Sequence, residues 1–572
     1  MSFKLVVVES PAKCRKIEEY LGAGYKCMAS FGHLREISGL SSIAVDNQYK
    51  IKFDIPSGSK RKQIVSLREC AKRASEVVIA TDDDREGEAI GWHLCMILKL
   101  PVKTTKRIIF NEITRPAIRQ AIENPTILNM NLILAQQARQ VIDMLVGYTV
   151  SPVLWKKISQ TTEKGLSAGR CQTPALRIAY ENAISVKENP GDVVYNTIGY
   201  FTSKNLPFSL NKTFQSAEET EEFLEKSCGF DHLFDTSPVK KGIKCAPLPF
   251  TTSSLQQQSS NELRYSPKET MKLCQTLYEA GLITYMRTDS TTYAESFLKD
   301  TNEYISGKWG DKFSNTENVN KCKPKKGKKG KSKSADAKAD MAQEAHEAIR
   351  PTDIRKVNLG DEIGPKEKRM YKLIWRNTLE SCMADAQVET ISITLTAPQS
   401  AMYKYNAERI TFMGWMIVSH EKDDSAITFD YLLKLKKGQV LPYNRITSKM
   451  SIRNQKQYLN EAKLVKELED RGIGRPSTYS SLVDKIQQRG YVKNKDIAGR
   501  KINCTDYELV DAEMTLTEEV RELGAQKNRL VIQPIGKLVH DVLMSGFAPL
   551  FEFDYTKAME ADLDSIAKGN KT

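Results

Sequence analysis

The chain has 572 residues, of which 40% are hydrophobic and 27% charged, and its formal net charge is +14. A chain of this length is too long to fold around a single hydrophobic core, so several domains are expected. The composition is that of a globular protein. No apolar run reaches the ~20 residues of a membrane helix and no secretory pattern opens the sequence, which predicts an intracellular protein of the cytoplasm, nucleoid or nucleus without a membrane partner.

The spacing of the cysteines and the distribution of the positive charge both limit the possible functions. The eleven cysteines stand singly without a C-x-x-C pair, so no zinc site and no disulfide framework are expected in this span. The excess charge suggests a polyanionic partner, but eight lysines lie in the tract 321–333. We expect residues 321–341 to be a disordered insert, which either contacts phosphates or is merely solvated.

Residues 1–130 are predicted to form an α/β domain. Lys4–Val8 and Glu76–Ala80 are apolar runs typical of buried strands. A helix is expected to begin at Pro11, because proline is tolerated in the first turn of a helix. A second helix is expected over residues 86–98.

The rest of the chain alternates between helical and strand-rich regions. Apolar residues recur at helical spacing in 131–185, and helices are also predicted for 246–380 and 455–572. Alternating and β-branched residues predict strands within 190–245 and 380–454. No tandem repeat is present.

The strongest local signal is the acidic run Thr81–Glu88, placed where a buried strand turns into a helix. Three carboxylates lie close together in this run, those of Asp82, Asp84 and Glu86. Each of them raises the pKa of the others unless a cation neutralises them. The first strand ends in Glu9, and the ends of strands in one sheet would bring it beside the other acids. Hard oxygen ligands suit Mg²⁺. The same run would also serve as an ordinary acidic start of a helix.

A candidate nucleophile follows a helix that Ser266 caps and that ends at Gly281. The extended piece 282–290 contains Tyr285 and Arg287, which would project from the same face of a strand. A phenol with a pKa of ~10 is a poor nucleophile, and a neighbouring guanidinium both favours the phenolate and grips phosphate. Taken alone, Tyr-x-Arg is more often a structural pair.

Two further segments suit phosphate binding. His346 and Arg350 are four residues apart on a predicted helix that Pro351 ends, so they would share a face. A helix that starts near Thr478 would offer an anion-friendly N-terminus, and Arg489 lies about three turns further on.

Taken together and in order along the chain, these motifs resemble those of a type IA DNA topoisomerase of the bacterial topoisomerase I kind. The motifs that carry the resemblance are Glu9 with Lys13, Asp82/Asp84/Glu86, SAGRCQTPALR (167–177), GLITYMRTDS (281–290), AHEAIRP (345–351) and RGIGRPSTY (471–479).

The resemblance implies a multidomain α/β plus α fold, with a Toprim domain followed by a toroidal four-domain core that includes a strand-rich arch. The corresponding regions are 1–130 for the Toprim domain, 131–189 with 455–572 for a helical DNA-binding gate domain, 190–245 with 380–454 for the arch, and 246–379 for the domain that carries the tyrosine and the insert.

The resemblance also implies an activity: relaxation of negatively supercoiled DNA without ATP, through a transient 5′-phosphotyrosine. It implies that the catalytic residues are Tyr285, Glu9, Lys13, Arg287 and His346, and that Glu9, Asp82, Asp84 and Glu86 hold one or two Mg²⁺ ions. Implied contacts to single-stranded DNA are His33, Arg139, Asp143, Tyr148, Trp155, Ser167, Ala168, Gly169, Arg170, Cys171, Gln172, Arg287, Arg350, Thr478 and Arg489. A monomer is expected.

The residues also admit different functions. Primases and certain nucleases with Toprim domains share the acidic signature but do not need the tyrosine segment around Tyr285. A topoisomerase that acts mainly as a decatenase or on RNA would carry the same motifs, and so would a DNA-binding Toprim protein that lacks catalysis. Asp83 adds a charge where the family motif is usually uncharged, and the family gives no role for the lysine tract.

Overall fold

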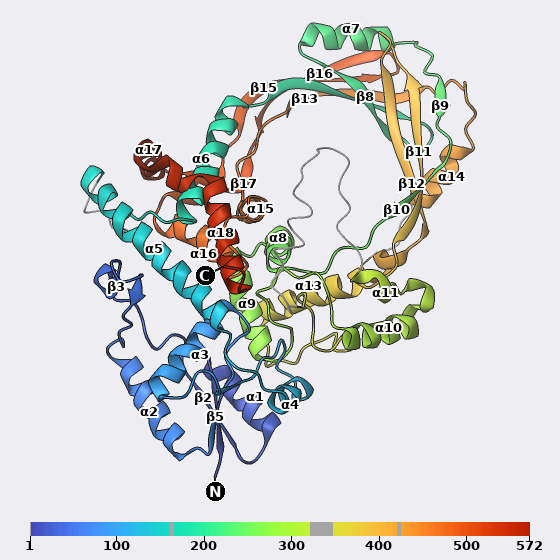
Figure 1. Ribbon diagram of the computed structural model, residues 1–572. Coiled ribbons are helices and arrows are strands. Elements are labelled where there is room, and N and C mark those ends of the chain that lie inside the picture. The colour runs from blue at the N-terminus through green and yellow to red at the C-terminus, as the bar shows by residue number, and fades with distance from the viewer. Residues whose placement is uncertain (1, 159–164, 321–346, 420–424, 572) are drawn as a thin grey trace.

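The computed structural model describes residues 2–158, 165–320, 347–419 and 425–571. The lysine tract 321–333, the rest of the predicted insert 321–341, and His346 lie outside the described residues. The described elements form a ring, with an α/β domain at the bottom of Figure 1, an arched sheet at the top and helices between them. No helix in these ranges is long and apolar enough to cross a membrane.

The N-terminal α/β unit, here called the sheet domain (residues 2–128), is built on a four-stranded sheet. Its strands, in the order β2-β1-β5-β6, are β2 (Tyr25–Ala29), β1 (Lys4–Val8), β5 (Glu76–Ile79) and β6 (Lys106–Arg107). All neighbouring pairs are parallel, and the two predicted apolar runs are its central strands. Helices cover both faces: α1 (Pro11–Leu21), α2 (Ser59–Arg73), α3 (Arg85–Leu98) and α4 (Arg115–Glu123).

The two faces of β1 belong to different cores, because successive side chains of a strand point in opposite directions. Leu5 and Val7 pack with residues of α2 and α3. Val6 and Val8 belong to a core that continues into the helices that flank the tyrosine segment and includes Tyr285. One continuous core thus fixes the sheet domain against the segment that carries the candidate nucleophile.

The helices around that segment are α8 (Thr252–Glu262), α9 (Pro267–Glu279), α10 (Glu295–Trp309), α11 (Thr316–Val319) and α13 (Pro365–Ser381). Ser266 caps α9 as predicted, accepting a hydrogen bond from the Glu269 N–H at 3.1 Å. Gly281 follows the helix with a φ of 66°, in the left-handed region that glycine enters without strain. The chain can therefore turn sharply into the tyrosine segment.

The arch is one sheet of nine strands whose neighbours run antiparallel. Its order is β10 (Lys240–Lys244), β11 (Ala386–Thr396), β12 (Met402–Phe412), β8 (Leu206–Phe214), β7 (Asp192–Phe201), β13 (Tyr443–Arg453), β15 (Arg500–Val510) and β16 (Glu513–Leu523), with β9 (Phe234–Thr236) paired to β11. In Figure 1 this sheet curves over the top of the ring.

The helical prediction for residues 455–572 is wrong in its middle part. Four strands lie there: β15 and β16 extend the arch sheet, and β14 (Val492–Ile497) pairs with β17 (Gln526–Ile532). In β16 nearly every side chain is exposed on both faces, so the segment lacks the apolar alternation that marks a half-buried strand. Its pairing with β15, rather than a buried face, sets its conformation.

Two helices, α7 (Ala217–Ser227) and α14 (Ser425–Leu433), lie beside the arch, and a further group, called here the gate helices, packs together at the left of the ring in Figure 1. The gate helices are α5 (Met130–Lys157), α6 (Gln172–Glu188), α15 (Glu461–Asp470), α16 (Tyr479–Gln488), α17 (Pro534–Phe547) and α18 (Phe553–Ala567). α18 is tied to its neighbours by buried ion pairs. Glu560 accepts a hydrogen bond from Arg170 at 2.7 Å, and Asp564 pairs with both Arg475, at 2.6 Å, and Arg85 of α3.

Glu560 supports the gate helices through its charge. Burial alone would raise its pKa, but Arg170 and Arg475 outweigh burial and lower the pKa to about 2. Because the pKa is depressed on folding, the stabilisation is fully present above the ordinary carboxyl pKa of 4.5 and is lost as the pH falls from there toward 2.

We predict that Glu560→Gln destabilises α18 by about 3 kcal/mol at pH 7, as follows from a pKa shift of this size. Amide hydrogen exchange of α18 measures this local free energy. The difference from the unsubstituted protein should shrink at pH 3. Glu552→Gln, which removes only the half-exposed partner of Arg177, should cost less than about 1 kcal/mol. Equal losses in the two variants would contradict the prediction.

Candidate active site

Acidic side chains gather where two neighbouring parallel strands end. Glu9 follows β1, and the aspartate run follows β5, so both lie at one edge of the sheet. The backbone N–H of Asp82 donates to Glu9 Oε1 at 2.9 Å. Asp84 caps α3, its Oδ1 accepting from the Gly87 N–H at 2.8 Å. A Cβ at Gly87 would lie 2.1 Å from the Asp82 carbonyl oxygen, so only glycine allows this turn.

A buried cation holds the first aspartate. Lys13 is fully buried, and its Nζ pairs with Asp82 Oδ1 while lying 5.1 Å from the centroid of the Tyr278 ring. Burial raises the pKa of Glu9 to about 7, the charge of Asp82 contributes to this rise, and Lys13 opposes both. Glu9 is therefore a carboxyl group that can carry a proton near neutral pH, as a general acid requires.

Tyr285 lies against this edge of the sheet. Its side chain is only 4% exposed, and its Oη donates to Asp84 Oδ2 at 2.7 Å. Arg287 Nη1 donates to the same oxygen at 3.0 Å. The Tyr285 backbone N–H donates to the Asn111 carbonyl at 2.7 Å, and the Tyr278 ring packs edge-on against the Tyr285 ring at 5.2 Å. The prediction that Tyr285 and Arg287 face the same way is confirmed.

The charges keep the phenol protonated in this arrangement. Burial raises the pKa of Tyr285 well above its ordinary value, the charge of Asp84 adds to this, and Arg287 opposes it. Burial would also raise the pKa of Asp84, but Arg287 and the Tyr285 hydrogen bond outweigh it and hold that pKa below its ordinary value. Arg287 keeps 36% of its side chain exposed, so it can also reach an incoming anion.

The expected helix ending at Pro351 is wrong for the described residues 347–351, which are extended. Ile349 forms a β-bridge with Phe250, and the Thr284 N–H donates to the Arg350 carbonyl at 2.9 Å. These contacts use backbone groups that a helix would pair internally. The tyrosine segment, residues 282–290, is not a continuous strand either. Among its residues, all of which the structure describes, only Ile283 forms a β-bridge, with Pro351.

Glu86, the third predicted metal ligand, points to a different neighbourhood. Its Oε2 lies 3.1 Å from His33 Nε2 and accepts from Gln136 Nε2 at 3.1 Å. Burial would raise the pKa of Glu86, but the hydrogen bond and charge of His33 hold it below its ordinary value. Glu86 thus links the acidic edge of the sheet to α5.

The donor set at this edge fits Mg²⁺, because carboxylate oxygens are the ligands that this ion prefers. Across the described ranges, no three acidic, histidine or cysteine side chains converge as a metal site. Asp82 and Asp84 are each directed to a protein cation instead. Burial is the main cause of the raised pKa of Glu9 and the charge of Asp82 adds to it, so a cation bound at this edge would lower that pKa. The assignment of Glu9, Asp82, Asp84 and Glu86 to Mg²⁺ stays a prediction.

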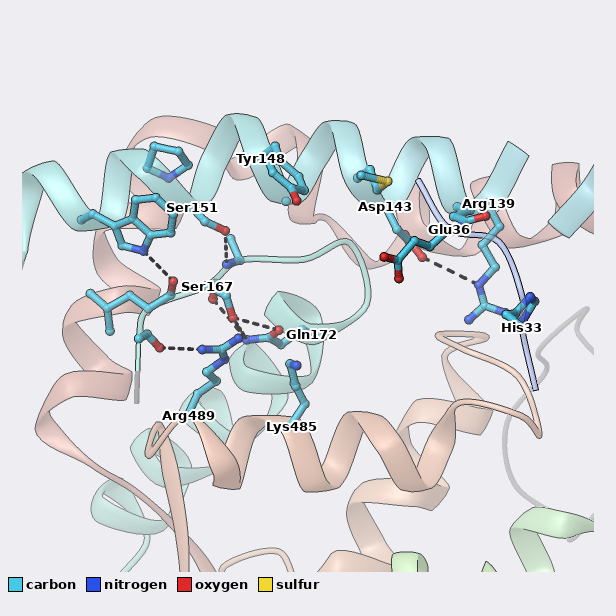
Figure 2. A pocket seen from close by; sticks show the side chains of 18 of the residues that line it. His33, Glu36, Arg139, Asp143, Tyr148, Ser151, Ser167, Gln172, Lys485 and Arg489 are labelled. Carbon is cyan, nitrogen blue, oxygen red and sulfur yellow. Dashed lines mark hydrogen bonds and ion pairs between the residues drawn. The ribbon is translucent and has the colours of Figure 1, made fainter. Parts of the chain in front are cut away.

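A cleft of about 1390 Å³ lies beside this edge, and Figure 2 shows its side chains. α5 runs along one wall, and the loop 165–172 and the end of α16 lie opposite. Tyr148 and Trp155, which line it, have about half of their side chains exposed. The predicted contacts that line the cleft are His33, Arg139, Asp143, Tyr148, Trp155, Ser167, Ala168, Gln172 and Arg489.

The cleft is also lined by residues that no sequence motif predicts. Those on α5 follow a helical spacing of three or four residues with the predicted ones, and this stripe could have revealed them. Lys485 precedes Arg489 by four residues and shares its face of α16. The missed lining residues are Arg35, Glu36, Gln136, Gln140, Met144, Gly147, Ser151, Pro152, Gly165, Leu166 and Lys485, and the cleft includes Glu86 as well.

Several predicted contacts do not line the cleft. Arg170 is buried between Glu560 and Asp143, and Arg350 is buried between Glu112 and Glu347, 3.0 and 2.6 Å away. Those arginines are already neutralised. Gly169 and Cys171 flank Arg170 outside the cleft lining, and Thr478 exchanges hydrogen bonds with the Arg475 backbone at 2.8 and 3.0 Å.

The chain matches two protein families. The DNA topoisomerase family matches residues 127–522, well over half of the chain, and the Toprim domain matches residues 4–113. Among solved structures, full-length topoisomerase I from Thermotoga maritima is similar, with 28% sequence identity and a TM-score of 0.80. The similarity covers 99% of this chain and 87% of that one. The predicted fold class is thereby confirmed.

Proposed function

We propose that this chain, which belongs to the type IA DNA topoisomerases, relaxes negatively supercoiled DNA by cutting one strand through Tyr285, passing a strand and resealing the break. The observation that carries the proposal is the position of Tyr285 Oη, 2.7 Å from Asp84 of the Toprim motif and beside Arg287. It combines a nucleophile, an acceptor for its proton and a cation for phosphate in one place.

The cleft beside α5 suits one strand of DNA. Its cations, Arg35, Arg139, Lys485 and Arg489, can face phosphates, and its two exposed aromatic rings can stack on bases. Single-strand binding would explain a preference for negatively supercoiled substrates, since underwound DNA offers unpaired segments. Glu86 lines this cleft and also lines a small cavity that contains Asp84 and Arg287.

The chemistry exchanges one phosphoester for another. Tyr285 Oη attacks the phosphorus, its proton passing toward Asp84 Oδ2, and the bond from phosphorus to the 3′-oxygen breaks. Arg287 would hold a non-bridging oxygen, and Glu9, protonated in part near neutral pH, would give its proton to the 3′-oxygen. Because the phosphotyrosine conserves the bond energy, resealing runs the same steps backwards and needs no ATP.

Mg²⁺ would be held by Asp82, Asp84 and Glu86 together with Glu9. When bound it supplies positive charge that keeps the cleaved ends together for resealing. Lys13, already paired with Asp82, positions that carboxylate and lowers the negative charge around the scissile phosphate.

We predict that Tyr285→Phe abolishes the covalent protein–DNA adduct. Single-stranded DNA labelled at its 3′ end should migrate with the unsubstituted protein on a denaturing gel, because the 5′ side of the break stays on the tyrosine. Tyr278→Phe, which removes a neighbouring buried hydroxyl, serves as the matched control and should keep the adduct. An adduct that persists in Tyr285→Phe would exclude this nucleophile, and a free 5′-phosphate would indicate a nuclease.

We predict that relaxation needs Mg²⁺ and that Asp82→Ala combined with Asp84→Ala blocks it while leaving part of the cleavage activity. Plasmid relaxation and adduct yield, measured side by side with Mg²⁺ and with EDTA, separate the two steps. Asp83→Asn changes the charge between the two positions and should still relax. Full relaxation by the double variant in EDTA would refute the metal role of these aspartates.

We predict that Tyr148→Ala weakens binding of single-stranded DNA by about tenfold, the size of one lost stacking contact. Tyr148→Phe keeps the ring and should bind normally. Tyr555, exposed to 40% on α18 and not part of the cleft lining, provides the control Tyr555→Ala, which should have no effect. Fluorescence anisotropy with a labelled oligonucleotide measures the three variants beside the unsubstituted protein. Unchanged affinity of Tyr148→Ala would argue against base stacking in the cleft.

A further inference from the structure

A second cavity, of about 330 Å³, is lined by Met286 and Arg287, which follow Tyr285 in the chain. It is formed where three parts of the chain meet. Glu9 and Asp82 come from the sheet domain, Lys272 and Gln275 from α9, and Ser480 from the start of α16. Its volume falls within the range of pockets that hold small ligands.

The second cavity continues the path of the cleft. A small cavity of about 20 Å³ shares Glu86 and Arg139 with the cleft, and it shares Arg287 and Ser477 with the second cavity. The three spaces therefore follow one another past Arg287. A strand that enters along α5 and presents a phosphate to Arg287 would reach the second cavity with its next nucleotide.

The cation in this second cavity is available for a ligand. Lys272 is exposed, and within the described part of the chain its ammonium group has no carboxylate partner. Lys268, one turn earlier on the same helix, is paired with Asp484 at 2.8 Å. A lysine without a carboxylate partner, in a cavity that Arg287 also lines, is suited to meet an anion that comes from outside.

The rest of the lining suits a nucleotide. Gln275 and Ser480 can donate hydrogen bonds to phosphate or base atoms, and Met271 and Met286 supply apolar surface for a sugar or a base. The acids lie at the sheet edge, where Asp82 is already paired with Lys13. A phosphate would therefore be placed on the side of α9, toward Lys272 and Arg287.

We propose that this second cavity is a DNA subsite: it takes the nucleotide that adjoins the scissile phosphate on the side away from the cleft, and Lys272 neutralises that nucleotide's outer phosphate. The proposal rests on the proposed function, because the scissile phosphate is located by Tyr285. It adds to that function a contact between Lys272 and the DNA, which would fix the position of the strand on the far side of the scissile phosphate.

The test uses one single-stranded oligonucleotide with a mapped cleavage site and a set of variants of it. In each variant one phosphate, at one of the positions on either side of the scissile one, is replaced by a neutral methylphosphonate. Binding and adduct yield are measured for the unsubstituted protein, Lys272→Gln and Lys268→Gln. Lys268→Gln is the matched control, since it removes the same charge from the same helix outside the cavity.

For the unsubstituted protein, neutralising one phosphate next to the scissile one should weaken binding by about tenfold, as expected for a lost hydrogen bond to a charged group. Lys272→Gln should bind the unmodified strand about tenfold more weakly than the unsubstituted protein does. Neutralising the phosphate next to the scissile one should then cause no further loss of affinity in this variant. Its log–log salt dependence should be shallower by roughly 0.7. Lys268→Gln should respond at every position as the unsubstituted protein does.

The subsite is refuted if each methylphosphonate lowers the binding affinity of Lys272→Gln and of the unsubstituted protein by the same factor. This outcome is distinct from failure of the proposed function, which would appear as no Tyr285-dependent adduct on the unmodified strand. The binding measurements do not depend on cleavage and can be repeated in Tyr285→Phe, so each result bears on the subsite alone.

Discussion

The site depends on one carboxylate that serves three partners. Asp84 accepts the Gly87 N–H that starts α3, the Tyr285 hydroxyl and the Arg287 guanidinium. The first contact belongs to the sheet domain, and the other two come from a segment some two hundred residues further along the chain. Because the cap fixes Asp84 and the core shared by both parts fixes Tyr285, the phenol is held against the Toprim motif by the protein's own contacts.

That arrangement is also a closed one. The space between the cleft and the second cavity is only about 20 Å³, which is too small for a nucleotide. Arg85 and Arg475 border this constriction, and both are paired with Asp564 of α18. Buried ion pairs of this kind are costly to break singly, because the remaining charge is left without a partner. Widening this constriction by moving α18 away from α3 would break the pair between Asp564 and Arg85.

The sequence predicts the parts of this site that are local. The strand ends carrying Glu9 and Asp84, the cap of α9, and the shared side of Tyr285 and Arg287 all follow from residues within a few positions of one another. The stripe of α5 that lines the cleft also follows helical spacing, although only some of its residues were predicted. In contrast, β16 was not predicted because its pairing with β15, and not an apolar face, determines its structure.

The sequence does not distinguish arginines that face open space from arginines that are buried in ion pairs, because their chemistry is the same. Arg139 and Arg287 stay near open space, whereas Arg170 and Arg350 are buried and neutralised by Glu560 and Glu112. Glu560 and Glu112 lie hundreds of residues away from these buried arginines, so no local motif indicates the two pairs. The second partner of Arg350, Glu347, is only three residues away, but its proximity in sequence does not show that the pair is buried. The same limit explains Lys272, whose sequence neighbours are those of an ordinary exposed helix position. Only the cavity between α9, α16 and the sheet edge distinguishes it from Lys268, one turn earlier, which an aspartate of α16 already neutralises.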